Sequence, residues 1–381
     1  MLKNRVFYIL LLLAIVIIYI FTNTYYTLLL MALCIILPVI SLVLMLISGK
    51  SLDISADVPG TAQKNDVHLS YTMTNKSIMP VAQVMFTVLM ENQLTGSTSK
   101  RKVNASIGGK KTVTARLALM NSRSGMVHIS TQKIRVYDAL GLFTLKKADL
   151  QDKTVAVYPD MNDVSVSMEK PVETRGDGTR YSPDRPGQDV SELFALREYA
   201  AGDEIRKIHW KLSSKIDRMM VRDFSLPLNY SVFLLAELTQ DSEDAVDSLV
   251  ETYLSLSKGL LENGINHNLA WFDAGDSVFH VRAMDDFEDL EMAVAHMLAS
   301  YPSQAPSTAL DYYAASGYRN NQTILIYVVS KPDFDKIAEI EVAQRMNTVL
   351  IYEDEAMKYE AQQNIEVLPV KAGEPLPEII I

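Results

Sequence analysis

Residues 196–224 contain a concentration of basic and aromatic side chains that is typical of a binding surface. Seven basic residues and one of the two tryptophans lie there: Arg197, Arg206, Lys207, Lys211, Lys215, Arg218, Arg222 and Trp210. Because the whole chain has a formal net charge of -10, this local excess of positive charge would attract an acidic partner. Tryptophan and arginine dominate the energetics of protein interfaces. The predicted partner-binding surface consists of Arg197, Asp203, Arg206, Lys207, Trp210, Lys211 and Lys215.

No catalytic grouping accompanies these residues. His209 has no nucleophile paired with it in sequence, so a structural position is predicted for it rather than the role of a general base. The sequence lacks Gly-x-Ser-x-Gly, His-Glu-x-x-His and P-loop motifs, and its single cysteine, Cys34, lies in an apolar run. A noncatalytic protein is therefore predicted. A hydrolytic enzyme with an unrecognised site is one alternative.

One amphipathic helix is predicted to position the charged residues. Asp203 is a favourable N-cap, and Glu204 suits the positive end of the helix dipole. Trp210 and Arg206 turn away from an apolar face that consists of Ile205, Ile208, Leu212 and Ile216. Trp210 is then either covered by the preceding connector or domain, or it is an exposed anchor for a partner. In a further alternative, Asp203 and Arg206 only fix the connector against the C-terminal domain.

Two uncharged apolar runs, residues 6–21 and 25–47, predict a transmembrane hairpin in residues 1–50, with lipid contacts through residues 6–47. A cleaved signal peptide is the alternative, but the first run has no small-residue cleavage site and a second span follows it at once. Lys3, Arg5 and Lys50 flank the hairpin, whereas its turn is uncharged. The positive-inside rule therefore predicts that both termini and the soluble domains are cytoplasmic.

The remaining chain is predicted to form two domains and a connector. Residues 51–160 contain short alternating apolar runs between turn signals, which predict an immunoglobulin-like β-sandwich. Residues 161–195 are rich in Gly, Pro, Asp, Arg and Ser, and are predicted to be an extended connector without regular structure. Residues 196–381 alternate strands with helices after the charged segment, which predicts a three-layer α/β domain. No Gly-rich fingerprint follows its first strand, so a dinucleotide site is not predicted.

The charged segment resembles the signature of a bacterial family, the "domain of unknown function 58" family. The matching positions read Leu-Arg-Glu-Tyr-x-x-Gly-Asp-x-x-Arg-x-Ile-His-Trp-Lys-x-Ser-Ser-Lys and end in Val-Arg-Asp-Phe. They lie within residues 187–224, and the apolar hairpin and a Tyr-Asp-x-x-Gly-Leu-Phe stretch resemble the family layout over most of the chain. The resemblance implies a membrane-tethered protein with a degenerate von Willebrand factor A-like domain. It also implies a MoxR-type AAA+ ATPase as a working partner.

The same resemblance directs attention to a metal site. Von Willebrand factor A-like domains that bind metal place Asp-x-Ser-x-Ser after the first strand, and hard oxygen ligands of this kind suit Mg²⁺. The corresponding candidates here are Glu237, Thr239, Asp241 and Thr308. Glu237 has a different reach from aspartate, and Ser330 and Lys331 stand where a later aspartate is expected. A degenerate site with no metal and no cofactor is therefore predicted. A metal-dependent adhesion module, which would need a working ion site, is the other alternative.

Together these features predict a noncatalytic, membrane-anchored scaffold or adaptor in assembly or cell-envelope processes. Its partner would be a protein, for which the resemblance implies a MoxR-type AAA+ ATPase. The acidic net charge argues against nucleic acid as a partner, because phosphate binding requires a basic surface.

Overall fold

The computed structural model places most of the chain, and its described residues fall into two compact units. The first unit consists of Met1–Asp160, Gln240–Glu251 and Val294–Pro302, and the second of Met161–Thr239, Thr252–Ala293 and Ser303–Ile381. The described residues are 2–64, 67–118, 123–167, 181–187, 189–200, 203–227, 232–316, 318, 324–341, 346–353, 367–376 and 378–380.

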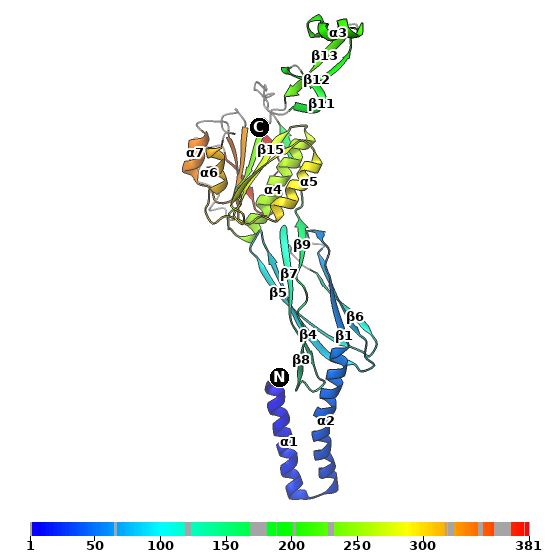
Figure 1. Cartoon of the computed structure of the whole chain (residues 1–381). Coiled ribbons are helices and arrows are strands. Elements are labelled where there is room, and N and C mark those ends of the chain that lie inside the picture. The colour runs from blue at the N-terminus through cyan, green and yellow to red at the C-terminus, as the bar shows by residue number, and fades with distance from the viewer. Residues whose placement is uncertain are drawn as a thin grey trace. The chain divides into compact units, whose positions relative to one another are not determined.

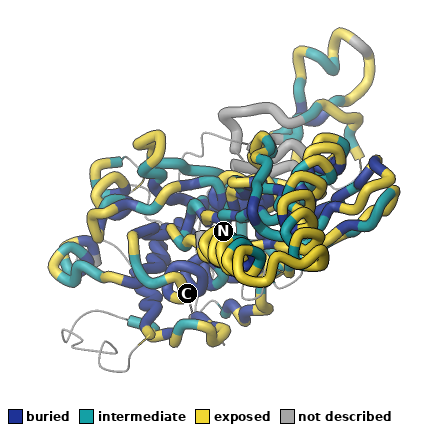
Figure 2. The backbone as a smooth tube through the Cα atoms, turned by 90° about the horizontal axis from the view of Figure 1, so that it is seen from below, coloured by how far each residue is buried: buried dark blue, intermediate teal, exposed yellow. Residues whose placement is uncertain are grey.

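Two apolar helices open the first unit: α1 (Leu2–Thr22) and α2 (Tyr25–Lys50). Both are long and apolar enough to cross a membrane. Most of their residues are exposed, and Figure 2 draws the backbone of these residues in yellow beside the N-terminus. Pro38 lies inside α2 without ending it. The predicted apolar hairpin is confirmed as two helices of spanning length.

Two β-sheets follow the helices. An antiparallel sheet has the order β1-β3-β6, with β1 (Leu52–Asp57), β3 (His68–Asn75) and β6 (Thr112–Ala118). The second sheet has the order β2-β9-β7-β4-β5, with β8 beside β7. Its strands are β2 (Thr61–Gln63), β4 (Val81–Asn92), β5 (Thr98–Ile107), β7 (Gly125–Tyr137), β8 (Thr144–Lys146) and β9 (Lys153–Tyr158). Alternate residues of β3 are buried, which is the pattern of a sheet with one face on a core.

Apolar side chains from both sheets share one core. Tyr71 and Phe86 are fully buried, with ring centroids 5.0 Å apart. The Tyr71 hydroxyl shares a hydrogen bond of 2.9 Å with Thr131, so its polar atom is satisfied. Met45 of α2 belongs to the same core. The mostly-β character predicted for this region is confirmed, and the immunoglobulin-like type stays a prediction.

A small antiparallel sheet contains the charged segment in the second unit. Its order is β11-β13-β12, with β11 (Tyr181–Gly187), β12 (Asp189–Glu198) and β13 (Met220–Pro227). The 3-10 turn η1 (Ile205–Lys207) and the short helix α3 (Trp210–Ile216) connect β12 to β13. We refer to residues 189–227 as the signature segment.

The single helix predicted from Glu204 to Ile216 is wrong. Ile208 has extended geometry, with φ -69° and ψ 132°, and it forms an isolated β-bridge with Val221. His209, not Asp203, is the N-cap of α3. Ile205 is 68% exposed instead of lying on a buried apolar face. The helical spacing is present in the sequence, but pairing with β13 overrides it in the middle of the segment.

The connector predicted over residues 161–195 contains regular structure, which contradicts that expectation. β10 (Ser165–Ser167) pairs in parallel with β20 (Glu378–Ile380), and β11 and most of β12 lie in the same range. The two prolines of β11 are tolerated because β11 is an edge strand, where a missing N–H need not cost a ladder bond. Residues 168–180 lie outside the described residues.

A six-stranded sheet forms the main body of the second unit. Its order is β16-β15-β14-β17-β18-β19, and every neighbouring pair is parallel except β15 with β16. The strands are β14 (Val232–Ala236), β15 (His267–Asp273), β16 (Val278–Met284), β17 (Ile324–Val329), β18 (Met346–Tyr352) and β19 (Val367–Lys371).

Helices lie on both faces of this sheet. Figure 1 shows α4 and α5 on one face and α6 and α7 on the other. Their bounds are α4 (Glu243–Glu262), α5 (Phe287–Leu298), α6 (Thr308–Ala315) and α7 (Phe334–Glu341). β14, β17 and β18 are buried at every residue, as parallel strands covered on both faces should be. The predicted α/β class is confirmed, and the von Willebrand factor A-like type stays a prediction.

Candidate functional site

The signature segment exposes large apolar side chains to solvent. Trp210, the first residue of α3, is 59% exposed, and Ile205 and Met219 are 68% and 50% exposed. Ile208 and Val221 of the same segment are buried. Exposed apolar side chains that form a contiguous surface can mark a contact site, so this segment is a candidate interaction surface. The structure thus leaves Trp210 exposed rather than covered, and its role as an anchor for a partner stays a prediction.

Three exposed cations lie near Trp210 in the sequence. Arg206, Lys211 and Lys215 are exposed, and no carboxylate in the described part of the chain forms an ion pair with them. Lys207 differs, because its ammonium lies 3.4 Å from a Glu204 carboxylate oxygen. We call Ile205, Arg206, Trp210, Lys211 and Lys215 the exposed patch.

Arg197 and Asp203 are engaged in an internal ion-pair network instead. Two guanidinium nitrogens of Arg197 donate to the two oxygens of Asp203, each at 2.7 Å, and its Nε donates to Asp223 at 2.9 Å. Asp203 also accepts the Ala200 N–H at 2.8 Å. Arg197 and this amide lower the pKa of Asp203 to about 2. These two residues therefore join β12 to β13 and to the loop after β12, and offer no free charge to a partner.

His209 sets the start of α3. Its Nδ1 accepts the Leu212 N–H at 3.1 Å, and its own backbone N–H donates to Met220 O at 2.8 Å. Ser213 Oγ accepts the Met220 N–H at 2.9 Å, which ties α3 to β13. The imidazole thus caps a helix, as Asn or Ser commonly do, and its ring bonds an amide rather than a nucleophile. These bonds fix the backbone from which Trp210 projects.

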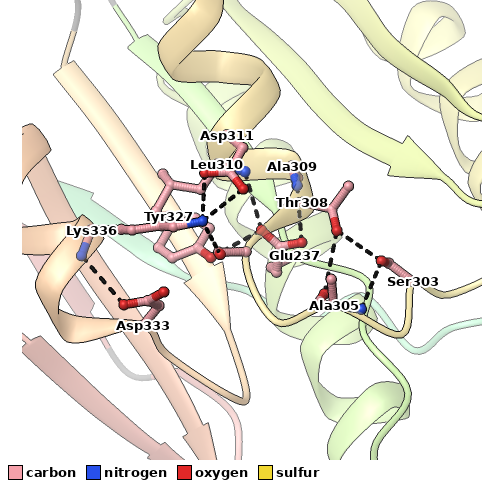
Figure 3. A network of polar contacts seen from close by, with 11 residues as sticks. Glu237, Ser303, Ala305, Thr308, Ala309, Leu310, Asp311, Tyr327, Asp333 and Lys336 are labelled. Atoms are coloured by element: carbon pink, nitrogen blue, oxygen red, sulfur yellow. Dashed lines mark hydrogen bonds and ion pairs between the residues drawn. The ribbon is translucent and has the colours of Figure 1, made fainter.

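A second polar cluster surrounds Glu237, directly after β14 (Figure 3). Glu237 is fully buried; its Oε1 accepts the Ala309 N–H at 3.0 Å, and its Oε2 accepts the Leu310 N–H at 3.1 Å and the Tyr327 hydroxyl at 3.0 Å. Because α6 begins at Thr308, the carboxylate satisfies amides that lack helical partners. Burial raises the pKa of Glu237 to about 7, although the hydrogen bonds favour the charged form.

Neighbouring polar side chains complete the Glu237 cluster. Lys336 Nζ donates to Ser307 Oγ at 2.8 Å and to the Asp311 carboxylate oxygens at 2.6 and 2.7 Å. Ser303 Oγ and Thr308 Oγ1 share a hydrogen bond of 2.8 Å. Figure 3 shows these contacts gathered around the N-terminal end of α6. The cluster is therefore a set of contacts between parts of the second unit.

The Glu237 cluster does not fit a divalent cation. N–H and O–H donors face both oxygens of Glu237, and the Lys336 ammonium is already nearby, whereas a cation needs free oxygen lone pairs. Of the other candidate ligands, Thr308 is bonded to Ser303, and Asp241 accepts the N–H of the next residue at 2.8 Å. Thr239 is buried, and its hydroxyl has no described partner.

The sequence reasoning missed a cluster of carboxylates and imidazole at the β15–β16 turn. Asp273, Asp276 and His280 bring ligand-type atoms within 4.8 Å of one another. Both aspartates accept backbone N–H groups of the turn, and the His280 ring stacks on Trp271 at 5.2 Å. These turn and stacking contacts account for the three residues. Their only sequence signal is a spacing of three and four residues across a hairpin.

Comparisons with known proteins connect the signature segment to one family. Residues 195–250 match the family model described as "Protein of unknown function DUF58". "Uncharacterized protein YeaD" of Bacillus subtilis (strain 168) is 26% identical over 196 residues, which cover 51% of this chain and 48% of that protein. The chain thus spans about half the length of this curated relative. Neither description states an activity.

Similarity to solved structures is slight. A beta-glucosidase from Listeria innocua gives a TM-score of 0.20 with 13% identity, covering 28% of this chain and 16% of that chain. A cohesin module from a family 33 glycoside hydrolase of Clostridium perfringens ATCC13124 gives 0.19 with 10% identity, covering 28% and 96%. Such TM-scores support no inference about fold or function.

Proposed function

Because this chain belongs to the DUF58 family through residues 195–250, we propose that it is a noncatalytic, membrane-anchored adaptor that binds a protein partner through the exposed patch. One observation carries the proposal: Trp210 is 59% exposed, and three exposed cations near it in the sequence form no ion pair among the described residues. The patch lies within the residues that the family model matches.

The chemistry of the patch defines the partner surface. Trp210 would supply the apolar anchor, and Arg206, Lys211 and Lys215 would face carboxylates. The Arg197 network and the His209 cap hold the backbone in place before binding, which reduces the entropy lost on association. We therefore propose an acidic partner surface with an apolar pocket for the indole.

The partner that we propose is a MoxR-type AAA+ ATPase, because the sequence resembles a family that works beside such enzymes. A partner of this kind requires the patch to face the cytoplasm. Lys3, Arg5 and Lys50 flank the apolar hairpin and favour that topology. An alkaline phosphatase fused after Ile381 should be inactive, and activity outside the membrane would contradict the proposed orientation.

A noncatalytic role is supported by how the polar clusters are used. His209 caps a helix, and the Glu237 oxygens accept bonds from the protein itself. His209 bonds a backbone amide, and the Tyr327 hydroxyl that Glu237 accepts is fully buried, whereas general-base catalysis would require a nucleophile that a substrate can reach.

Binding of the full chain in detergent micelles to a purified MoxR-type ATPase from the same source organism tests the proposed function. Trp210→Ala should weaken binding about thirtyfold, because truncating an interface anchor typically costs about 2 kcal/mol. The double variant Lys211→Gln with Lys215→Gln should also weaken binding. Its loss of affinity should be larger at low salt than at high salt, because salt screens the attraction between charges.

Lys100→Gln with Lys102→Gln is the matched control, because both lysines are exposed on β5 and the charge change is equal. This control should bind as the parent does. Unchanged binding of Trp210→Ala, or equal losses in the two double variants, would contradict the patch as the binding surface. If the ATPase binds no form of the chain, the proposed partner is wrong.

A further inference from the structure

The last turns of α2 are packed firmly onto the two-sheet body of the first unit. Ser41 Oγ donates to Asp138 Oδ2 at 2.8 Å in a buried position, and Met45 lies in the core of the sheets. Gly49 passes so close to β8 that an added Cβ would lie 2.7 Å from Leu145 Cδ2. The end of the apolar helix therefore has a fixed position relative to the sheets, and only part of the predicted 6–47 lipid contact surface is free of protein.

The opposite face of the same turns stays apolar and exposed. Val43, Leu46 and Ile47 are 47%, 37% and 47% exposed, so the lipid-facing surface of α2 continues to Ile47. Lys50 lies three residues later, about 5 Å further along the helix at roughly 1.5 Å per residue. With α2 in a membrane, Lys50 lies near the level of the lipid head groups.

A pocket of about 370 Å³ opens at this level. Its polar lining consists of Lys50, Lys146, Lys147 and Asp53, and the remaining lining is mainly apolar. Lys50 and Lys146 are exposed, and within the described residues neither forms an ion pair. Asp53 is 3.4 Å from the Lys76 ammonium, which offsets its charge. The pocket therefore carries more positive than negative charge.

Lys147 is the third basic residue in the pocket lining. Its ammonium donates to the Leu52 carbonyl oxygen, and burial lowers the pKa of Lys147. An anion in the pocket would stabilise this half-buried ammonium. The apolar lining beside it, which includes Leu52 and Leu145, suits the glycerol and first methylene groups of a lipid.

We propose that this pocket binds the phosphate head group of an anionic phospholipid from the surrounding bilayer. Lys50 and Lys146 face the head group, and the fixed end of α2 forms one wall. The inference rests on α1 and α2 lying in a membrane, and it is independent of any partner of the exposed patch. A bound lipid would thus set the height and tilt of the first unit on the membrane.

Native mass spectrometry of the full chain, released from detergent micelles with added lipid, tests this site. Phosphatidylglycerol should bind saturably and more tightly than phosphatidylcholine. Lys50→Gln with Lys146→Gln should weaken phosphatidylglycerol binding about thirtyfold, since each lysine near an anionic head group contributes roughly fivefold. Lys146→Gln alone, at an exposed position outside any helix, should weaken it about fivefold.

Two controls separate this site from general charge and from free anions. Lys100→Gln with Lys102→Gln removes two exposed charges from β5 and should leave lipid binding unchanged. Inorganic phosphate at equal concentration should not displace the lipid. Equal binding of the two lipids, equal losses in the two double variants, or displacement by phosphate would each overturn the proposal.

Discussion

Glu237 and Trp210 lie in the same matched segment, yet the first is fully buried and the second is 59% exposed. Around Glu237, donors from α6 and β17 satisfy the carboxylate inside the fold. Around Trp210, the apolar surface and three cations have no described counterpart in the chain. The two regions therefore differ in what their side chains contact. The Glu237 cluster stabilises the sheet and its helices, whereas the exposed patch is available to another molecule.

The largest expected effect is on stability and comes from Glu237→Ala. The change leaves the Ala309 and Leu310 amides and the Tyr327 hydroxyl without their acceptor, and each buried unpaired donor costs about 1–3 kcal/mol. We expect the free energy of unfolding to fall by about 4 kcal/mol. Urea unfolding followed by fluorescence of the buried Trp271 measures this free energy. A Trp210→Phe background leaves Trp271 as the remaining tryptophan.

Glu288→Ala is the control for that measurement, because Glu288 is exposed in the first turn of α5. It should change stability by no more than about 0.5 kcal/mol. Equal effects of the two substitutions would show that the Glu237 cluster does not support the fold.

The second prediction uses pH on the same cluster. Burial raises the pKa of Glu237 from 4.5 to about 7, so the native state keeps its proton where the unfolded state has lost it. Glu237 therefore contributes its full share to the free energy of unfolding below about pH 4.5, and this contribution is lost as pH rises toward about 7. Each unit of pKa shift corresponds to about 1.4 kcal/mol. Urea unfolding followed by Trp271 fluorescence should show that the free energy of unfolding falls by about 3 kcal/mol over this pH range.

Glu237→Gln tests whether that slope belongs to this carboxyl group. The variant cannot ionise, so the part of the pH dependence between about 4.5 and 7 that comes from Glu237 should disappear. A slope that persists unchanged in the variant would assign it to other groups.

A smaller and local effect is expected from Asp203→Asn. The variant weakens the bonds to Arg197 and to the Ala200 N–H, so hydrogen exchange at the Ala200 amide should become faster. Unfolding followed by Trp271 should not change. In the parent, the same loosening should appear as pH falls from about 4 toward 2, where Asp203 becomes protonated. Unchanged exchange at Ala200 would contradict the network.

The smallest expected effect on stability comes from Trp210→Ala, the variant expected to lose most in partner binding. Because Trp210 is largely exposed, the free energy of unfolding should change by less than about 0.5 kcal/mol. A loss above 2 kcal/mol would show that Trp210 packs inside the protein. The contrast between the patch and the Glu237 cluster would then disappear.

The strands of the six-stranded sheet were predictable because burial on both faces leaves a continuous apolar run. β14 and β17 read Val-Phe-Leu-Leu-Ala and Ile-Leu-Ile-Tyr-Val-Val, and every residue is buried. The signature segment was not predictable in the same way. Ile208 has the spacing of a helical apolar face, but its pairing with Val221 is a tertiary contact that propensity does not contain.

The candidate sites were predictable only in part, for a related reason. Composition alone identified the basic residues and Trp210. Which cations are free depends on pairings such as Arg197 with Asp223, 26 residues away. Likewise, Glu237 finds its donors 72 and 90 residues later, at Ala309 and Tyr327. A single sequence does not show such partners.

The parallel pair of β10 with β20 has a consequence for how the chain folds during synthesis. Ser167 Oγ donates to Glu378 Oε1 at 3.4 Å across 211 residues. At a translation rate of about 5–20 residues per second, β20 is synthesised on the order of 10–40 s after β10. β3 and β6 are separated by far fewer residues, so they can pair while the rest of the chain is still being translated. During this interval, residues 165–167 of the nascent chain have no partner strand. An unpaired strand edge can associate with other chains, so this is the period in which chaperone binding would help most.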